Sequence, residues 1–463
     1  MIRQMLPEEF KQRIGAQEYI DSEALIKALD EPSPVSIRIN PSKWNKKPLN
    51  AESVPWCRNG YYLDTRPSFT LDPLFHSGCY YPQEASGMFL EQVVNQAAGS
   101  LNNIRVLDLC GAPGGKSTHL SEIIGPDSLL VANETIRARA VILAETMTKW
   151  GSGNTLVTRN DPSVFARIPG YFDLIVVDAP CSGEGMFRTN SAVSEWSAEN
   201  SIHCAERQKR ILTDVWPALK ENGILIYCTC TFNPGENEEN IKWLTGKHGA
   251  ESIRVEVGTF NGIKEIDYRG IYGYGFFPGK VRGEGFFISV VRKSCKKEEQ
   301  SVRTRRIPGL KPGKTDIKVT SGWTDFPESR ILRWGSEIFA IPCDLNDYLY
   351  LFQNLKVIKA GTKISVVKNN DHLPSHELAL SHKFKTDSFP RVELNLSEAV
   401  SYMRRDNFTN RDIPEGWNIL TYRNINVGFV NNVGRRVNNY FPVEWRIRLD
   451  ASVLAQTPPI TWL

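Results

Sequence analysis

Two cysteines that follow neighbouring apolar runs are the residues of this chain best suited to covalent chemistry. Cys181 stands three residues after Asp178, the acid that ends the run FDLIVVD, and Cys230 follows the run GILIYCT. Adjacent parallel strands end at the same edge of a sheet, so both thiols should lie there together. A thiolate beside an acid predicts covalent attack on an electron-poor ring, followed by group transfer. Cys228 is expected to be a core residue of its strand.

A glycine-rich turn, LDLCGAPGGKSTHL, leads from a strand ending at Asp108 into a helix that begins near Gly115. Such glycines let a ligand lie against the backbone at the helix N-terminus. An NTPase phosphate loop is excluded, because it needs glycine where this chain has Cys110. A dinucleotide-binding fingerprint is excluded as well, because no G-x-G-x-x-G can be read in this turn. The remaining interpretation is a nucleotide-like ligand that is not held by a phosphate chain. Gly111, Gly114 and Gly115 are the positions where its approach to the backbone is expected.

Acids at the ends of the next two apolar runs support a nucleotide-like ligand. Glu134 ends SLLVANE, 26 residues after Asp108, where an acid typically binds ribose hydroxyls. Asp161 follows NTLVTR and could meet an adenine edge. Each acid alone is more often a solvated loop residue. Their positions at successive strand ends favour a binding role.

The elements that would position these residues form an α/β pattern. From Ile104, apolar runs of four to six residues alternate with helical periods, including a long helix over about 200–221, which predicts a doubly wound parallel sheet. The run 283–293 should close the sheet, with IYGYGFFPG as a hairpin partner. Upstream, helices are expected over about 7–14 and 16–29, before a strand that ends at Asn40.

Length and composition indicate a globular chain of two or three domains. The chain has 463 residues, of which 41% are hydrophobic and 23% charged, with no apolar run long enough for a membrane span and a charged N-terminus unlike a signal peptide. Nine cysteines, an odd number without C-x-x-C spacing, argue against a disulfide framework or a zinc site and favour the cytoplasm. We therefore expect no metal and no membrane association.

The basic charge is concentrated in the last third, where 27 Lys and Arg stand against 18 Asp and Glu after Val291. That asymmetry suggests a polyanionic partner, although a slightly basic surface would explain it equally well. We expect an N-terminal segment over 1–95, a catalytic domain over 96–293, a basic linker over 294–318 and a strand-rich domain over 319–463. In the last of these, adjacent Arg435 and Arg436 cannot both face inward on a strand, so a contact with a polyanionic partner is expected there. The neighbouring aromatics Phe429, Phe441 and Trp445 are expected to be core residues.

Three motifs, CGAPGGK, DAPCSGEG and the Tyr-Cys-Thr-Cys stretch running into NPGENE, closely resemble those of the RNA cytosine-5 methyltransferases of the Nol–Nop–Sun group, most of all its RsmB/RsmF branch. SIRIN at 36–40, YYPQEASGMF at 80–89 and VGRRVNNYFP at 433–442 fit the RsmF type, and the tail resembles a PUA-like RNA-binding domain more loosely. Cys228, where the family often has Ser, and Gly111, commonly Ala, are small departures.

The resemblance implies a Rossmann-like S-adenosylmethionine-dependent methyltransferase core, with a small N-terminal α/β RNA-binding segment and a C-terminal strand-rich PUA-like domain. Cys230 matches the nucleophile of the family, and Cys181 matches the cysteine that assists release. Glu134 would lie at the ribose of S-adenosylmethionine, Asp161 near the adenine and Asp178 near the reacting end. The turn that would hold the cofactor consists of Cys110, Gly111, Ala112, Pro113, Gly114, Gly115 and Lys116. Arg38 in the N-terminal segment and Arg435 and Arg436 in the C-terminal domain are expected to contact RNA.

The substrate implied by the resemblance is a cytosine of 16S rRNA in the small ribosomal subunit, methylated by a cytoplasmic monomer. Carbon 5 of cytosine becomes nucleophilic enough when a thiolate adds to carbon 6, and protonation near ring nitrogen 3 by an acid such as Asp178 would help. The target base must leave its stack. A tRNA cytosine-5 methyltransferase and a non-catalytic RNA-binding ribosome-assembly factor are the alternatives. A DNA cytosine methyltransferase, with its nucleophile in a Pro-Cys motif, is disfavoured by the additional Thr-Cys motif.

Overall fold

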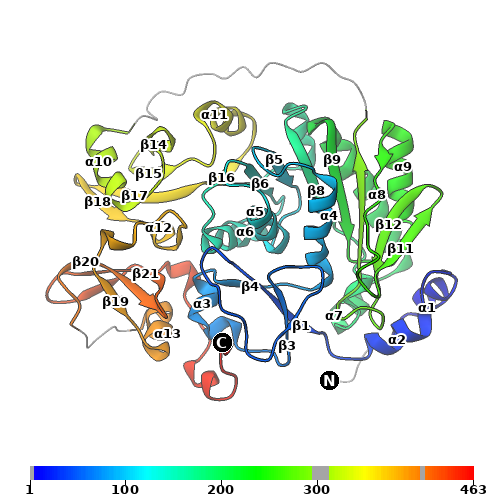
Figure 1. Ribbon diagram of the computed structural model, residues 1–463, viewed down its shortest axis with the longest axis horizontal. Coiled ribbons are helices and arrows are strands. Elements are labelled where there is room, and N and C mark those ends of the chain that lie inside the picture. The colour runs from blue at the N-terminus through cyan, green and yellow to red at the C-terminus, as the bar shows by residue number, and fades with distance from the viewer. Residues whose placement is uncertain (1–4, 295–311, 407–411) are drawn as a thin grey trace.

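The structure is a computed structural model that describes residues 5–294, 312–406 and 412–463. A ten-stranded sheet crosses its middle (Figure 1). Five parallel strands at the centre run in the order β9-β8-β5-β6-β7, and they are β5 (Arg105–Asp108), β6 (Leu129–Asn133), β7 (Thr155–Thr158), β8 (Phe172–Asp178) and β9 (Leu219–Thr229). The chain winds outward from β5 on both sides. The carboxyl ends of β5 and β8 are therefore the switch point at which such sheets bind ligands.

Antiparallel strands complete both edges of this sheet. Beside β9 lie β13 (Phe286–Arg292), β12 (Ile271–Phe276), β11 (Lys264–Tyr268) and the short β10 (Glu251–Ser252). The pairing of β12 with β13 confirms the expected hairpin partner. At the far edge, β16 (Val357–Ala360) comes from the last third of the chain and pairs with β7. The C-terminal part thus contributes a strand to the central sheet.

The helices of this part of the chain are α4 (Leu90–Ala97), α5 (Gly115–Ile123), α6 (Arg137–Trp150), α7 (Asn190–Glu195), α8 (Ala198–Val215) and α9 (Glu238–His248), of which α5 to α8 lie in connections between parallel strands. Helix α6 ends where Gly151 takes a left-handed conformation with φ of 89°. Helix α8 begins at a Ser197 cap and ends well before the expected residue 221. Pro217 cannot continue a helix, and Leu219 already starts β9.

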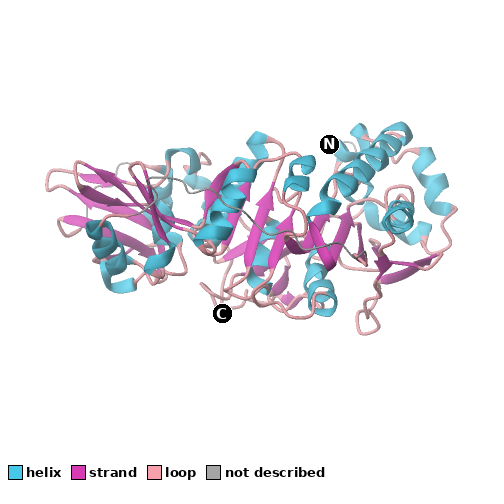
Figure 2. Cartoon of the chain, turned by 90° about the horizontal axis from the view of Figure 1, so that it is seen from above, coloured by secondary structure: helices cyan, strands magenta, loops and turns pink. Residues whose placement is uncertain are grey.

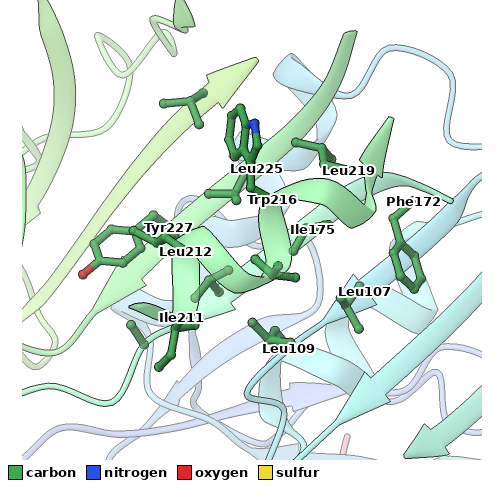
Figure 3. Close-up of a cluster of buried hydrophobic side chains, with 14 of the residues drawn as sticks. Leu107, Leu109, Phe172, Ile175, Ile211, Leu212, Trp216, Leu219, Leu225 and Tyr227 are labelled. Atoms are coloured by element: carbon green, nitrogen blue, oxygen red, sulfur yellow. The ribbon is translucent and has the colours of Figure 1, made fainter. Parts of the chain in front are cut away.

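Side chains alternate across the central sheet and pack into two apolar clusters, one on each face. Leu107, Ile175 and Leu225 pack with α8 on one face (Figure 3). Val106 and Val176 pack with α4, α5 and α6 on the other. This alternation follows from the two-residue period of a strand.

The N-terminal segment adds two helices and a small antiparallel sheet. Its elements are α1 (Glu8–Gly15), α2 (Ser22–Leu29), β1 (Val35–Ile39), β2 (Glu52–Ser53), β3 (Gly60–Leu63), α3 (Pro73–His76) and β4 (Tyr80–Pro82). The second helix begins later than the expected residue 16, because Asp21 accepts a hydrogen bond from Ala24 N and caps it. The small sheet has the order β2-β3-β1-β4.

The C-terminal part is rich in strands, as expected, and contains two four-stranded sheets. The first consists of β14 (Ile331–Trp334), β15 (Glu337–Ala340), β17 (Thr362–Lys368) and β18 (Asp371–Pro374), and the second of β19 (Arg391–Glu393), β20 (Gly416–Tyr422), β21 (Ile425–Asn432) and β22 (Val437–Asn439). Its helices are α10 (Lys314–Trp323), α11 (Leu345–Asn354), α12 (His376–Leu380) and α13 (Leu396–Arg404). Residues 314–318 of the expected linker therefore begin a helix, and 295–311 lie outside the described residues.

The molecule is elongated, with the C-terminal sheets at one end and α1 and α2 at the other (Figures 1 and 2). The final residues return to the N-terminal segment, where Trp462 bridges to Pro48 and its ring contacts that of Trp44. A shared core joins the N-terminal sheet to the second C-terminal sheet. In the described part of the chain, every helix is too short or too polar to cross a membrane.

Candidate active site

The glycine-rich turn between β5 and α5 is held in shape by close packing. Gly114 has φ of 121°, and a Cβ there would lie 2.5 Å from Thr146 Cγ2. A Cβ on Gly111 would lie 2.7 Å from Ser117 Oγ. Gly114 therefore needs glycine, whereas a Cβ at Gly111 would have to displace the Ser117 hydroxyl. The first turn of α5 presents free backbone N–H groups beside the loop.

Asp108 lies buried beneath this turn. Its Oδ2 accepts a 2.6 Å hydrogen bond from Ser117 Oγ, and its Oδ1 has no partner among the described residues. Burial raises the pKa of Asp108 to about 7. An unpartnered buried oxygen beside a glycine cradle leaves an acceptor for a ligand that donates hydrogen bonds.

Glu134 and Asp161 follow β6 and β7, at the same edge of the sheet. Glu134 is buried, and its Oε1 accepts a 2.9 Å hydrogen bond from Ile136 N. Asp161 is partly buried and caps the turn after it, and the hydroxyl of Ser163 lowers its pKa. Asn133, which the sequence did not single out, ties the loops together by donating to the carbonyls of Leu109 and Asn160.

Lys116 and Asp178 form an ion pair across the switch point. Lys116 Nζ donates to Asp178 Oδ2 at 2.8 Å, and both side chains are partly buried. The expected acid at ring nitrogen 3 is thus already an acceptor for an ammonium.

The side chains of Cys181 and Cys230, the two predicted reactive thiols, are in contact. Cys181 Sγ lies 3.0 Å from Cys230 Sγ, and Cys230 N donates to Cys181 Sγ at 3.3 Å. Both are free and partly buried, whereas Cys228 is fully buried in β9. The hydrogen bond with Cys230, together with burial, holds the pKa of Cys181 well above its usual range. Cys181 therefore keeps its proton at neutral pH.

Two buried glutamates behind the thiols fix the loops that carry them. Glu236 Oε2 accepts from Ser182 N at 2.9 Å and from Gln208 Nε2 at 3.0 Å, and burial raises its pKa. Glu184 accepts from Phe232 N at 3.1 Å and pairs with Arg13. Neither role was predicted from the sequence. The sequence did contain a signal for them. Each of the two loop motifs has a glutamate directly after a glycine, Glu184 in DAPCSGEG and Glu236 in NPGENE, and a purely solvent-exposed acid would not be expected to recur in this way.

Of the three arginines expected to contact RNA, one is buried and two are exposed. Arg38 is wrong as an RNA contact: its side chain is 0% exposed, stacks on Trp150 and donates to Gln83 and Thr118. It joins the N-terminal sheet to α5 instead. Arg435 and Arg436 are exposed in the turn between β21 and β22. The aromatic residues expected in the core are mostly there, with Phe429 and Phe441 buried and Trp445 partly buried.

One group of side chains in the described ranges has the donors that a metal ion needs, namely Cys57, Glu91 and His119. His119 Nε2 lies 3.2 Å from Glu91 Oε2 and 3.8 Å from Cys57 Sγ. Hydrogen bonding among the three accounts for this arrangement. The expectation of no metal stays a prediction.

Comparisons with known proteins agree along most of the chain. Residues 98–292 match the family model of the 16S rRNA methyltransferases RsmB/F, residues 6–85 that of the N-terminal domain of 16S rRNA methyltransferase RsmF, and residues 389–447 that of the methyltransferase RsmF PUA domain. A ribosomal RNA small subunit methyltransferase F from Pectobacterium atrosepticum is 30% identical, over 91% of this chain and 92% of that protein. One from Klebsiella pneumoniae is 28% identical, over 95% and 96%.

Solved structures resemble the fold of the catalytic part. A methyltransferase homolog from Pyrococcus horikoshii is 25% identical, covers 62% of this chain and 95% of its own, and has a TM-score of 0.52. NSun6 from the same organism, solved with SFG, is 18% identical, covers 63% and 99%, and has a TM-score of 0.51. These likenesses agree with the Rossmann-like core described above.

Proposed function

Because the chain belongs to the RsmB/F family of 16S rRNA methyltransferases, with N-terminal and PUA domains of the RsmF type, we propose that it methylates carbon 5 of a cytosine in small-subunit rRNA. The observation that carries the proposal is the pair of thiols 3.0 Å apart beside the switch point. One thiol can attack a ring while the other stays protonated next to it. An acid-base site without a nucleophile would not need this arrangement.

The residues around the glycine-rich turn fit S-adenosylmethionine. The glycine cradle, the unpartnered Oδ1 of Asp108 and the buried Glu134 offer backbone contact and acceptors for amino and hydroxyl groups. Asp161 would face the adenine, and Asp178 would lie near the reacting end. When bound, the cofactor supplies a methyl group on a positively charged sulfur.

Cys230 is the proposed nucleophile. Its thiolate forms a bond from Sγ to carbon 6 of cytosine, and the electron pair of the ring double bond becomes available at carbon 5 for the methyl group. Lys116 and Asp178 lie at the same strand ends and would hold the polar edge of the base. The ammonium of Lys116 favours electron density on the ring, because it stabilises developing negative charge.

Cys181 is proposed to assist release. After transfer, a base takes the proton from carbon 5, the ring double bond re-forms, and the bond from carbon 6 to sulfur breaks with its electrons returning to Cys230. A protonated thiol 3.0 Å away can donate a hydrogen bond to that departing thiolate. The raised pKa of Cys181 keeps the donor in place at neutral pH.

The function is tested by incubating the full chain with S-adenosylmethionine and 16S rRNA, free and in small subunits, and analysing the digested nucleosides by mass spectrometry. We expect 5-methylcytidine. A methyl group on a ribose or on another base would contradict the proposed chemistry. Methylation of tRNA with both rRNA substrates unmodified would contradict the proposed substrate.

A further inference from the structure

A cavity of about 350 Å³ lies beside the glycine-rich turn, and the mechanism above does not use it. Three parts of the chain form its walls: Phe75 and Tyr81 from the N-terminal segment, Pro113 from the turn, and Ile142, Lys149 and Trp150 from α6. We call it the α6 cavity. Its size is at the lower end of the range for small-molecule sites, enough for one flat ring system.

The walls of the α6 cavity are mainly aromatic and aliphatic, and its titratable side chains include Lys149, Glu145 and His76. Lys149 Nζ lies 5.5 Å from the centre of the Phe75 ring and 5.3 Å from that of Trp445. The same Nζ donates to Glu145 at 2.5 Å, so the cation is fixed in place. Aromatic faces beside a cation are the surroundings in which unpaired nucleobases stack.

The α6 cavity adjoins the candidate active site through Tyr81. A Cβ on Gly115 would lie 3.3 Å from Tyr81 Cε1, so this ring packs on the start of α5. The next residue, Lys116, holds Asp178. On the other side, Lys149 Nζ contacts the ring of Trp445, which the exposed Arg446 follows in the chain. The α6 cavity therefore adjoins the start of α5, one residue before the lysine that pairs with Asp178.

We propose that the α6 cavity holds an unpaired base of the substrate RNA, close in sequence to the target cytosine. The proposal rests on the proposed function, since it needs an RNA strand at the thiol pair. A base held there would fix the strand while the target is out of its stack. The exposed aliphatic side of the cavity, Ile142 at 49% exposure, would face the incoming nucleotide.

The test fills the cavity from α6. Ile142→Trp places a larger ring in it, and Val141→Trp is the matched control, because Val141 is the preceding residue of the same helix, is 58% exposed and does not line the cavity. We expect Ile142→Trp to weaken equilibrium binding of 16S rRNA roughly tenfold, about the contribution of one stacked base. S-adenosylmethionine affinity should be unchanged in both variants, and Val141→Trp should bind RNA as the wild type does.

A second pair of variants tests the ring itself. Tyr81→Ala should weaken RNA binding and Tyr81→Phe should restore it, with thermal unfolding measured to confirm that both fold. Equal RNA affinity for Ile142→Trp, Val141→Trp and wild type would overturn the proposal, as would a loss of S-adenosylmethionine affinity without loss of RNA affinity. Binding is measured without turnover, so this result stands apart from a failure to detect 5-methylcytidine.

Discussion

The chemistry of single residues is concentrated in two thiols, Cys181 and Cys230, whose sulfur atoms lie 3.0 Å apart. Cys181 keeps its proton because Cys230 and the surrounding protein disfavour its thiolate. RNA containing 5-fluorocytidine should form a denaturation-resistant adduct with the wild type, because fluorine at carbon 5 cannot leave as a proton does. Cys230→Ala should form no such adduct, because it lacks the attacking thiol. Cys181→Ala should accumulate an adduct with ordinary RNA. Denaturing gel electrophoresis measures both.

Cys228→Ser is the matched control for the thiol variants, because Cys228 is two residues from the nucleophile but buried in β9. It should trap 5-fluorocytidine RNA like the wild type. If Cys230→Ala still formed the adduct and Cys181→Ala did not, the two roles would have to be exchanged. Normal product release by Cys181→Ala would remove its proposed role.

Asp108 predicts a pH dependence of folding. Its folded pKa is about 7 and its ordinary value is 3.8, so between these values the folded chain keeps a proton that the unfolded chain has released. The free energy of unfolding should therefore fall as pH rises through this window and level off above 7. Asp108→Asn does not titrate. Relative to the wild type, it should gain on the order of 2 kcal/mol between pH 5 and pH 8.

Chemical denaturation at the two pH values measures the gain of Asp108→Asn, with Asp267→Asn, at an exposed turn, as the control. A constant difference between variant and wild type would contradict the raised pKa. The measurement needs no substrate, so it reports on the turn alone.

At the level of single residues, sequence predicts type and strand position well but not partners. Cys181 and Cys230 could be placed together because each follows a parallel strand. Arg38 could not be recognised as buried, because its partners Gln83 and Thr118 lie 45 and 80 residues away. A lone arginine in a short strand resembles a surface cation. Only the fold shows that its charge is matched by Glu122 inside the protein.

Among the elements, the loops after β8 and β9 are held in their relative positions by the carboxylate of Glu236. Glu236 accepts from the backbone of Ser182 and from Gln208, and so fixes the loop that carries Cys181. Glu236→Gln replaces an acceptor with a donor facing these N–H groups, a mismatch that costs about 1–3 kcal/mol. We expect slower adduct formation with 5-fluorocytidine RNA at unchanged S-adenosylmethionine affinity.

Glu239→Gln is the control for this loop, because Glu239 lies three residues later and is exposed. It should react at the wild-type rate. Loss of cofactor affinity in Glu236→Gln would show that the damage reaches beyond the two loops, and an unchanged adduct rate would make Glu236 a bystander.

The parallel core was predictable because its signal is local: each apolar run and each helix is read from neighbouring residues. β16 was not predictable in that way. Val357–Ala360 is a short run in the last third of the chain, and its pairing with β7 joins residues about 200 positions apart. The end of α8 was also misplaced, since apolar periodicity runs past Pro217 into β9.

On the scale of the whole molecule, the C-terminal part is bound into the catalytic sheet, which changes how its RNA contacts should be tested. Removing residues 294–463 would expose the edge of β7 and break the ion pair between Arg105 and Asp347. Such a truncation would disturb the folding of the catalytic sheet together with RNA binding. Substitutions on the intact chain are the better design.

Changing Arg435 and Arg436 to Gln in one variant should weaken RNA binding and flatten its salt dependence. Both are exposed, and each phosphate that is no longer neutralised lowers the slope of log affinity against log salt by about 0.7–0.9. Filter binding over a salt series measures the slope. The control changes Lys264 and Arg269, exposed on the β11 edge, to Gln. Equal slopes in the two double variants would remove any special role of the turn between β21 and β22.

The pairing of β16 with β7 also has a consequence for synthesis. The ribosome makes β7 about 200 residues before the strand that covers it, so the nascent sheet carries an open edge for much of translation. A prematurely terminated product would keep that edge. Such a fragment would have unpaired backbone groups at the edge of a hydrophobic sheet and would be prone to self-association. Chaperones and proteases, rather than RNA, would be its expected partners.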